Sequence, residues 1–123
     1  MALEIGFVFP GQGSQSVGMG KALYDAHSSL KSVYDEATTV LGYDIAELCF
    51  TGPAERLNLT EFTQPALLVS SVAAWKLFEP VGIKPVAVAG HSLGEYSAMV
   101  AAGGVSFRDA VGLVQKRGRR LAG

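Results

Sequence analysis

The sequence predicts an α/β fold in which a parallel sheet carries a sharp turn from a strand into a helix. Two short apolar runs, residues 5–9 and 86–89, are typical of strands buried on both faces. Helical spacing of apolar residues occurs between and after these runs, and this alternation favours a parallel sheet. A Gly-x-Ser-x-Gly pattern follows the second run, at residues 90–94.

The composition indicates that such a sheet would be incomplete in this chain. Of the 123 residues, 49% are hydrophobic and only 17% are charged, against roughly 25% charged in ordinary soluble domains. Two strands make a poor sheet, and apolar strands need neighbours and covering helices. We therefore expect residues 1–123 to be the N-terminal part of a larger domain whose remainder lies outside this chain.

The first half of the chain divides into a strand, a loop and a helix. The strand at residues 5–9 ends at Pro10-Gly11 and leads into a Gly-rich loop. One long amphipathic helix is predicted from about Lys21 to Leu41, with Gly42 as its C-cap.

The next segment contains turn-forming residues and then a second helix. Residues 51–64 are predicted to be a loop, with a short turn at Pro53 to Leu57. Pro65 is then expected to open a helix that runs to about Phe78.

The last third of the chain contains the second strand and two more helices. The strand at 86–89 is followed by an Ala-rich helix at about 93–102. A final helix at 107–121 is predicted because Ser106 and Asp109 form a capping pair at its start.

Charge and cysteine content exclude several classes of protein. The formal net charge of -1 and the lack of a long apolar stretch argue against nucleic-acid and membrane partners. Cys49 is the one cysteine and sits between apolar neighbours, so we expect a buried thiol and a cytoplasmic protein. With two histidines and no paired cysteines, no metal site is predicted.

Ser92, at the centre of the Gly-x-Ser-x-Gly pattern, is the candidate nucleophile. A strand precedes the pattern and a helix follows it, as a nucleophile elbow requires; the alternative is an ordinary N-cap serine. The backbone N–H of Leu93 is placed to donate to an oxyanion at the start of the helix.

The loop at residues 11–15 is the candidate for a second oxyanion donor, because it leaves the first strand at the edge where ligands bind in parallel sheets. A phosphate-binding loop is the competing interpretation. It is disfavoured because Ser16 stands where the last glycine of Gly-x-Gly-x-x-Gly belongs.

A general base is missing from the sequence pattern. His91 adjoins Ser92 in a sharp turn, so it is interpreted as a structural or pocket histidine, and His27 lies mid-helix. Elbow-type hydrolases have their histidine after the serine, and no histidine follows position 92. Glu95 is the one nearby carboxylate, and its expected role is to complement the helix dipole.

Arg117 stands at the edge of the inward face of the last helix, near Ala110 and Val114. A buried cation needs an anion, which favours a carboxylate ligand. The neighbouring basic residues at 116, 119 and 120 are expected to be solvated at the helix C-terminus.

Four segments, in the same order along the chain, carry a resemblance to a known family. They are Phe9-Pro10-Gly11-Gln12-Gly13-Ser14-Gln15, Thr63-Gln64-Pro65-Ala66-Leu67, Gly90-His91-Ser92-Leu93-Gly94-Glu95-Tyr96-Ser97-Ala98 and Gln115-Lys116-Arg117-Gly118. They closely resemble the malonyl-CoA:acyl carrier protein transacylase family of fatty acid synthesis, whose domain is more than twice as long. The fold implied is a hydrolase-like acyltransferase domain.

The resemblance implies that Ser92 takes a malonyl group from malonyl-CoA as an ester and passes it to the phosphopantetheine thiol of acyl carrier protein. Gln12 and Leu93 would form the oxyanion hole, and Arg117 would bind the malonyl carboxylate, with His91 as a second substrate-binding candidate. Coenzyme A enters as a substrate thioester, and no resident cofactor is implied. The histidine base would lie beyond residue 123.

Two other interpretations remain open at this point. A serine esterase or thioesterase shares the elbow, although the His-Gly-Gly-Gly type of oxyanion loop is absent. An inactive fragment is favoured by the missing base. Because the first strand begins within five residues of Met1, a free-standing bacterial-type enzyme is expected rather than a domain of a large synthase.

Overall fold

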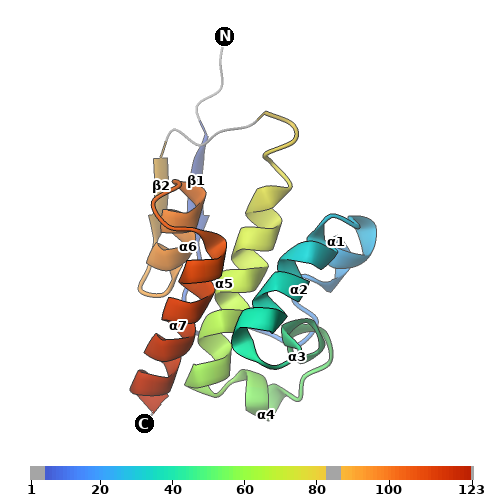
Figure 1. Ribbon diagram of the computed structural model, residues 1–123, viewed down its shortest axis with the longest axis vertical. Helices are drawn as coiled ribbons and strands as arrows, with labels where there is room; N and C mark the ends of the chain where they lie inside the picture. The colour runs from blue at the N-terminus through green and yellow to red at the C-terminus, as the bar shows by residue number, and fades with distance from the viewer. Residues whose placement is uncertain (1–4, 83–86, 123) are drawn as a thin grey trace.

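The computed structural model of the protein describes residues 5–82 and 87–122, which form two parallel strands and a surrounding set of helices (Figure 1). Strands β1 (Gly6–Phe9) and β2 (Ala87–Gly90) pair in parallel, with Gly6 opposite Ala87 and Phe9 opposite Gly90. The predicted parallel α/β arrangement is therefore confirmed. Val86, the expected first residue of the second strand, lies outside the described residues.

The helices between and after the strands are, in chain order, α1 (Lys21–Ala26), α2 (Leu30–Leu41), α3 (Ile45–Thr51), α4 (Ala54–Leu57), α5 (Thr60–Lys76), α6 (Gly94–Ala101) and α7 (Phe107–Ala122). Helix α5 lies at the centre of the molecule, with α7 along one side and α2 along the other (Figure 1). It packs against α2, α3, α4, α6 and α7. The core is formed mainly where these helices meet, and the sheet lies at its edge.

The sheet is covered less completely than the sequence predicts. Helix α6 packs against both strands, but the side chain of Val8 in the middle of β1 is 83% exposed. The expectation that both faces of this strand are buried is therefore wrong for this chain. The described residues provide helices for one face of the strand pair and no layer over Val8.

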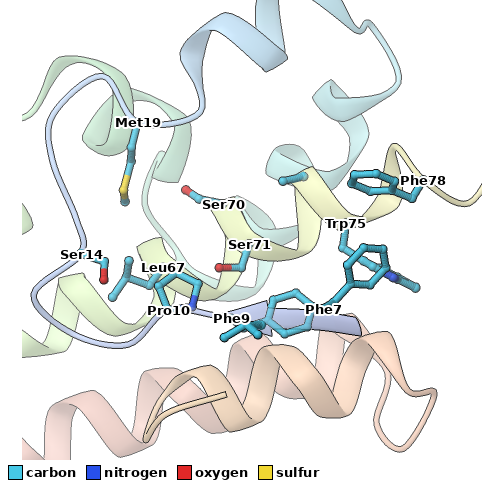
Figure 2. A pocket seen from close by; sticks show the side chains of 12 residues that line it. Phe7, Phe9, Pro10, Ser14, Met19, Leu67, Ser70, Ser71, Trp75 and Phe78 are labelled. Carbon is cyan, nitrogen blue, oxygen red and sulfur yellow. The ribbon is translucent and has the colours of Figure 1, made fainter. Parts of the chain in front are cut away.

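A hollow of about 380 Å³ lies beside the same strand, between β1 and α5 (Figure 2). Its walls are mostly apolar and include Phe7 and Phe9 from β1 and Leu67 and Trp75 from α5. The ring of Phe7 also contacts Phe78, with centroids 5.1 Å apart. Apolar surface is thus concentrated around β1.

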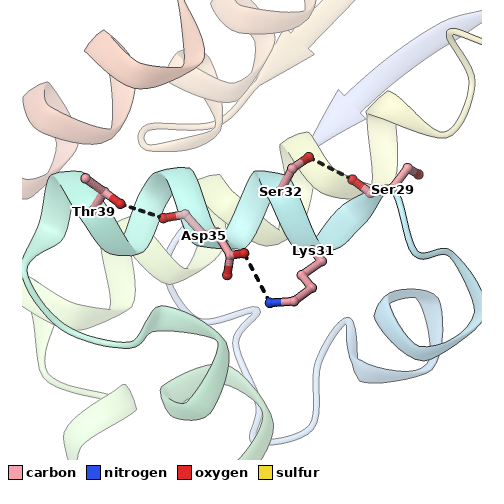
Figure 3. Close-up of polar contacts among 5 residues, drawn as sticks. All are labelled: Ser29, Lys31, Ser32, Asp35 and Thr39. Carbon is pink, nitrogen blue, oxygen red and sulfur yellow. Dashed lines mark hydrogen bonds and ion pairs between the residues drawn. The ribbon is translucent and has the colours of Figure 1, made fainter.

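The single helix predicted from Lys21 to Leu41 is wrong, because the chain forms two helices that are separated at residues 27–29. His27 adopts an extended backbone after α1 and is the C-cap of that helix, not a mid-helix residue. Serines in this segment compete for backbone hydrogen bonds, and the Ser32 hydroxyl donates to the Ser29 carbonyl at 3.0 Å (Figure 3). The break lets Tyr24 of α1 fold back against Tyr34 of α2, with ring centroids 5.3 Å apart.

The outer side of α2 is held by local polar contacts, as Figure 3 shows. Lys31 Nζ lies 3.2 Å from Asp35 Oδ2, and the Thr39 hydroxyl donates to the Asp35 carbonyl at 3.1 Å. Its inner side is buried, and Gly42 ends the helix with a φ of 85°, which confirms the predicted C-cap.

Helix α5 begins at Thr60, five positions before the predicted start, so Pro65 lies inside the helix. The carbonyl of Leu59 accepts hydrogen bonds from the amides of Phe62 and Thr63, both at 2.8 Å, and from the Thr63 hydroxyl at 3.0 Å. These bonds secure the first turn before the proline is reached, so the expectation that Pro65 opens the helix is wrong.

Helix α3 was not anticipated, although the sequence contains a signal for it. The Asp44 carboxylate accepts a hydrogen bond from the Glu47 amide at 3.0 Å, which is an N-cap with an acidic residue three positions later. Helix α3 buries Cys49 completely, as predicted, and burial raises the pKa of the Cys49 thiol to about 11. The thiol is therefore protonated and structural at neutral pH.

Helices α5 and α7 approach each other closely at Gly118, where a side chain would be crowded. A Cβ atom on Gly118 would lie 3.0 Å from Glu61 Cα and 3.1 Å from the Thr60 carbonyl oxygen. Neither of these backbone atoms can move without shifting α5. The contact therefore sets the spacing of the two helices.

We predict that Gly118→Ala lowers the free energy of unfolding by about 1–3 kcal/mol, because the added methyl overpacks this contact. Gly112→Ala is the matched control on the same helix, since its Cβ would meet Val40 at an ordinary 3.9 Å. Helix propensity should make that control neutral or more stable by up to about 1 kcal/mol. Denaturant unfolding measures both; equal stability of the two variants would contradict the close contact.

Candidate active site

Ser92 lies at the apex of a tight turn between β2 and α6, as the sequence predicts. Its φ of 56° is in the left-handed region, which non-glycine residues seldom adopt. The first turn of the helix begins at once, because the Glu95 amide donates to the Ser92 carbonyl at 3.1 Å. The Ser92 residue is exposed, so its hydroxyl is accessible to a ligand. This geometry is that of a nucleophile elbow.

The glycines that flank Ser92 are required by close backbone contacts. A Cβ on Gly90 would lie 2.0 Å from the Gly94 carbonyl carbon and oxygen, and one on Gly94 would lie 2.3 Å from the Phe9 carbonyl oxygen. No side chain fits in either place. The turn is therefore compressed against the end of β1, and the loop after β1 is brought next to the serine.

Arg117 reaches Ser92 from α7. Its Nη2 donates to Ser92 Oγ at 3.0 Å, and its Nη1 donates to Gln64 Oε1 at 2.6 Å. The guanidinium also lies over the ring of Tyr96, 5.5 Å from the centroid. Arg117 is half-buried, which agrees with its predicted place at the edge of the inward face. Residues 25 positions apart in the chain thus meet at one serine oxygen.

Gln12 belongs to the same polar cluster through Gln64. The Gln64 Nε2 donates to Gln12 Oε1 at 3.3 Å, and Gln12 Nε2 donates to the Thr60 hydroxyl at 3.1 Å. The structure therefore links Gln12 to Arg117 through a third side chain. No role is predicted for Gln64 from the sequence, although Gln64 lies in one of the four segments that carry the family resemblance.

Leu93 has a fully buried side chain, so only its backbone is available for chemistry. Within the described residues, its amide donates no backbone or side-chain hydrogen bond, and it stands one residue before α6. An unengaged amide at this place can donate to an oxyanion.

The remaining candidates lie at the margin of the site. His91 is exposed, and its carbonyl oxygen would be only 2.5 Å from a Cβ on Gly11, so the loop after β1 packs directly on the elbow. Glu95 is exposed in the first turn of α6, as expected for a residue that complements the helix dipole. His27 is the C-cap of α1, a helix that contacts α2 and takes no part in the site.

The arrangement activates Ser92 only in part. Among residues 5–82 and 87–122, the hydrogen bond to Ser92 Oγ comes from Arg117, and a guanidinium can donate but cannot accept a proton. Its positive charge favours negative charge that develops on the serine oxygen or on a bound ligand. The site therefore has a candidate nucleophile, a cation and a candidate oxyanion donor, while a base is missing from the described part.

The described residues contain neither a candidate metal site nor a helix that could span a membrane. No group of three or more histidine, cysteine, aspartate or glutamate side chains in this part of the chain could hold a metal ion. None of the helices between residues 5 and 122, outside 83–86, is long and apolar enough to cross a bilayer.

The fold and the site together define an acyltransferase-type serine protein with a nucleophile elbow on a parallel sheet. Comparison with known families identifies it further: residues 6–122 match the acyl transferase domain, and the chain belongs to this family.

Curated relatives are identical to the chain at about half of the aligned positions. The chain is 54% identical over 115 residues to the malonyl CoA-acyl carrier protein transacylase of Bacillus subtilis (strain 168). This alignment covers 94% of this chain and 36% of that protein. The enzyme of the same name from Escherichia coli (strain K12) is 50% identical over 117 residues, covering 94% and 38%. The chain thus spans less than two fifths of the length of these relatives.

Solved structures show the same likeness. The malonyl CoA-acyl carrier protein transacylase of Coxiella burnetii has a TM-score of 0.91 and 48% identity, covering 94% of this chain and 37% of that one. A malonyl-transacylase in complex with a type II polyketide acyl-carrier protein also has a TM-score of 0.91, with 49% identity over 95% of this chain and 38% of that one. The predicted family resemblance and the hydrolase-like acyltransferase fold are confirmed.

Proposed function

We propose that residues 1–123 form the nucleophile-bearing part of an enzyme that transfers malonyl groups from malonyl-CoA to acyl carrier protein in fatty acid biosynthesis. The observation that carries the proposal is the 3.0 Å contact between Arg117 Nη2 and Ser92 Oγ. This contact places a guanidinium, which can bind a carboxylate, beside the serine oxygen that would attack the thioester. The relatives named as malonyl CoA-acyl carrier protein transacylases support the same assignment.

The proposed reaction proceeds through an ester on Ser92. The serine oxygen attacks the thioester carbonyl of malonyl-CoA while a base takes its proton; the carbon–sulfur bond then breaks, and coenzyme A leaves as a thiol after accepting that proton. The Leu93 amide and Gln12 would stabilise the oxyanion. In the second half, the phosphopantetheine thiol of acyl carrier protein gives its proton to the base and attacks the ester carbonyl. A new carbon–sulfur bond forms, the bond to the serine oxygen breaks, and that oxygen takes the proton back from the base, which restores Ser92. Coenzyme A is a substrate here, and no resident cofactor is needed.

Arg117 gives the proposal its substrate class. Its charge is half-buried, and the carboxylate of a malonyl group would accept from a guanidinium in a bidentate arrangement, which an acetyl group cannot do. His91 lies at the same end of the sheet, and we keep it as a second candidate for contact with the substrate.

The base of this reaction would come from residues beyond position 123. Neither histidine of the sequence is placed as this base: His27 follows the end of α1, and His91 adjoins the serine in the turn. The relatives are more than twice as long as this chain, and the uncovered surface near Val8 offers room for further layers of the same domain. We place the complete enzyme in the cytoplasm, where coenzyme A thioesters are available.

We predict that Ser92 is the residue that becomes malonylated in the complete enzyme. Rapid acid quenching after incubation with malonyl-CoA, followed by peptide mass spectrometry, should show the malonyl group on Ser92 and none in Ser92→Ala. Ser97→Ala is the matched control, because that serine lies in the same segment but is buried at 1% exposure. A malonyl group on another residue of the unsubstituted enzyme would refute the assignment.

We predict that residues 1–123 alone transfer malonyl groups at a negligible rate. Loss of the base from a serine enzyme leaves binding and oxyanion stabilisation, and the rate can fall by as much as about a million-fold. Transfer to acyl carrier protein by the purified chain should match the background of its Ser92→Ala variant. Activity within about tenfold of the complete enzyme would show that the base lies inside residues 1–123.

We predict that Arg117→Ala in the complete enzyme selectively weakens malonyl transfer. The loss should be about 2–5 kcal/mol of transition-state binding, the usual cost of removing one partner of a desolvated charge pair. Acetyl transfer should be largely spared. Hydrolysis of malonyl-CoA without a carrier protein should stay slow in both the unsubstituted enzyme and Arg117→Ala. Equal losses for both acyl groups would show that Arg117 does not bind the carboxylate.

A further inference from the structure

Gln64 occupies the centre of the polar cluster, and both ends of its amide are in use. It is 2% exposed, its Oε1 accepts from Arg117 Nη1 at 2.6 Å, and its Nε2 donates to Gln12 Oε1 at 3.3 Å. A buried amide whose oxygen and nitrogen both have hydrogen-bond partners is held in one orientation. Gln64 is therefore a rigid part of the site.

The direction of every hydrogen bond in the cluster follows from the arginine. A guanidinium only donates, so the Gln64 oxygen must face Arg117 and its nitrogen must face Gln12. Gln12 then presents its own oxygen to Gln64 and donates from its nitrogen to Thr60 at 3.1 Å. The orientation of Arg117 is thus coupled to side chains on α5 and on the loop after β1.

Arg117 also lies against the ring of Tyr96 while it is bonded to Gln64 and Ser92. The guanidinium is 5.5 Å from the ring centroid, within the range in which a cation is attracted to an aromatic face. This attraction does not fix the direction of the N–H groups, whereas the hydrogen bond to Gln64 does. With Gln64 in place, one N–H of Nη1 is engaged and Nη2 is held at the serine.

The neutrality of Gln64 matters as much as its position. An amide oxygen holds Arg117 without cancelling the positive charge, so the remaining N–H groups stay available to an anion. A carboxylate at the same place would hold the guanidinium equally well and would compete with an incoming carboxylate for it. The Gln64 amide therefore suits a site in which the arginine must bind a charged ligand.

We propose that Gln64 is the positioning residue that sets the preference of this site for acyl groups with a terminal carboxylate. This inference rests on the proposed function, since it concerns the malonyl group on Ser92. Gln64 acts through Arg117: it keeps the guanidinium beside the serine oxygen, oriented and charged.

The test compares Gln64→Leu and Gln64→Glu in the complete enzyme, with malonyl-CoA and acetyl-CoA as alternative donors. Gln64→Leu removes the acceptor, whereas Gln64→Glu keeps the shape and the acceptor but neutralises the cation. Both should lower the ratio of malonyl to acetyl kcat/KM by about tenfold or more, as expected when a hydrogen bond to a charged group is lost. The change should appear as a raised KM for malonyl-CoA, with acetyl transfer largely preserved.

Gln115→Leu is the matched control. Gln115 is another glutamine with a side-chain bond between helices, from its Nε2 to the Leu41 carbonyl at 2.9 Å, but it lies away from Ser92. It should leave the ratio unchanged, and thermal melting of all three variants checks that they fold. Because Gln64→Glu is nearly isosteric, it remains informative if the Gln64→Leu protein does not fold.

An unchanged ratio in folded Gln64→Glu, or an equal fall in Gln115→Leu, would overturn the inference. If the unsubstituted enzyme prefers malonyl groups and Arg117→Ala removes that preference while Gln64→Glu keeps it, the inference fails and the proposed function stands. If the unsubstituted enzyme transfers no malonyl group, the proposed function fails and the inference fails with it.

Discussion

The contact between α5 and α7 at Gly118 is the constraint on which the site depends. The α7 backbone at Gly118 lies against Thr60 and Glu61 of α5. This contact brings the neighbouring residues of the two helices close to one another. One turn further along α5 stands Gln64, and the residue before Gly118 is Arg117, so their 2.6 Å hydrogen bond follows from the helix spacing. The same contact lets Arg117 reach across to the elbow. Close packing of two helices therefore determines which side chains meet the serine.

The electrostatics of the site are set by a cation without a carboxylate partner among the described residues. The ion pairs found in that part of the chain join Lys21 to Asp25 and Lys31 to Asp35, on the outer sides of α1 and α2. Arg117 instead contacts an amide oxygen, a hydroxyl and an aromatic ring, all of which leave its charge uncancelled. A half-buried cation in this situation gains more from an incoming anion than a solvated lysine would, because part of its desolvation has already occurred.

The parts of the structure that the sequence predicts are those in which local pattern and local geometry agree. The elbow is one, since Gly90 and Gly94 lie only two positions in sequence from the serine whose turn they permit; the Gly42 C-cap is another. The break at His27 was missed because the contact it allows, Tyr24 on Tyr34, depends on tertiary packing and leaves the apolar spacing helical on both sides. Gln64 was missed for a similar reason. A glutamine inside a helix carries no sign of the arginine 53 positions later to which it bonds.

The proton of Ser92 indicates from which side a base must act. A serine oxygen has one hydrogen and two lone pairs, and the 3.0 Å contact shows that Arg117 donates to one of these lone pairs. The hydroxyl hydrogen cannot then point at the guanidinium. The exposed side of the elbow is open to a base, since Ser92 and His91 are both exposed there. A base that approached from the side of α7 would meet the guanidinium first and would be held as its ion pair, which would weaken it as a proton acceptor. Separate approaches for the arginine and the base follow from the hydrogen-bonding capacity of a single oxygen atom.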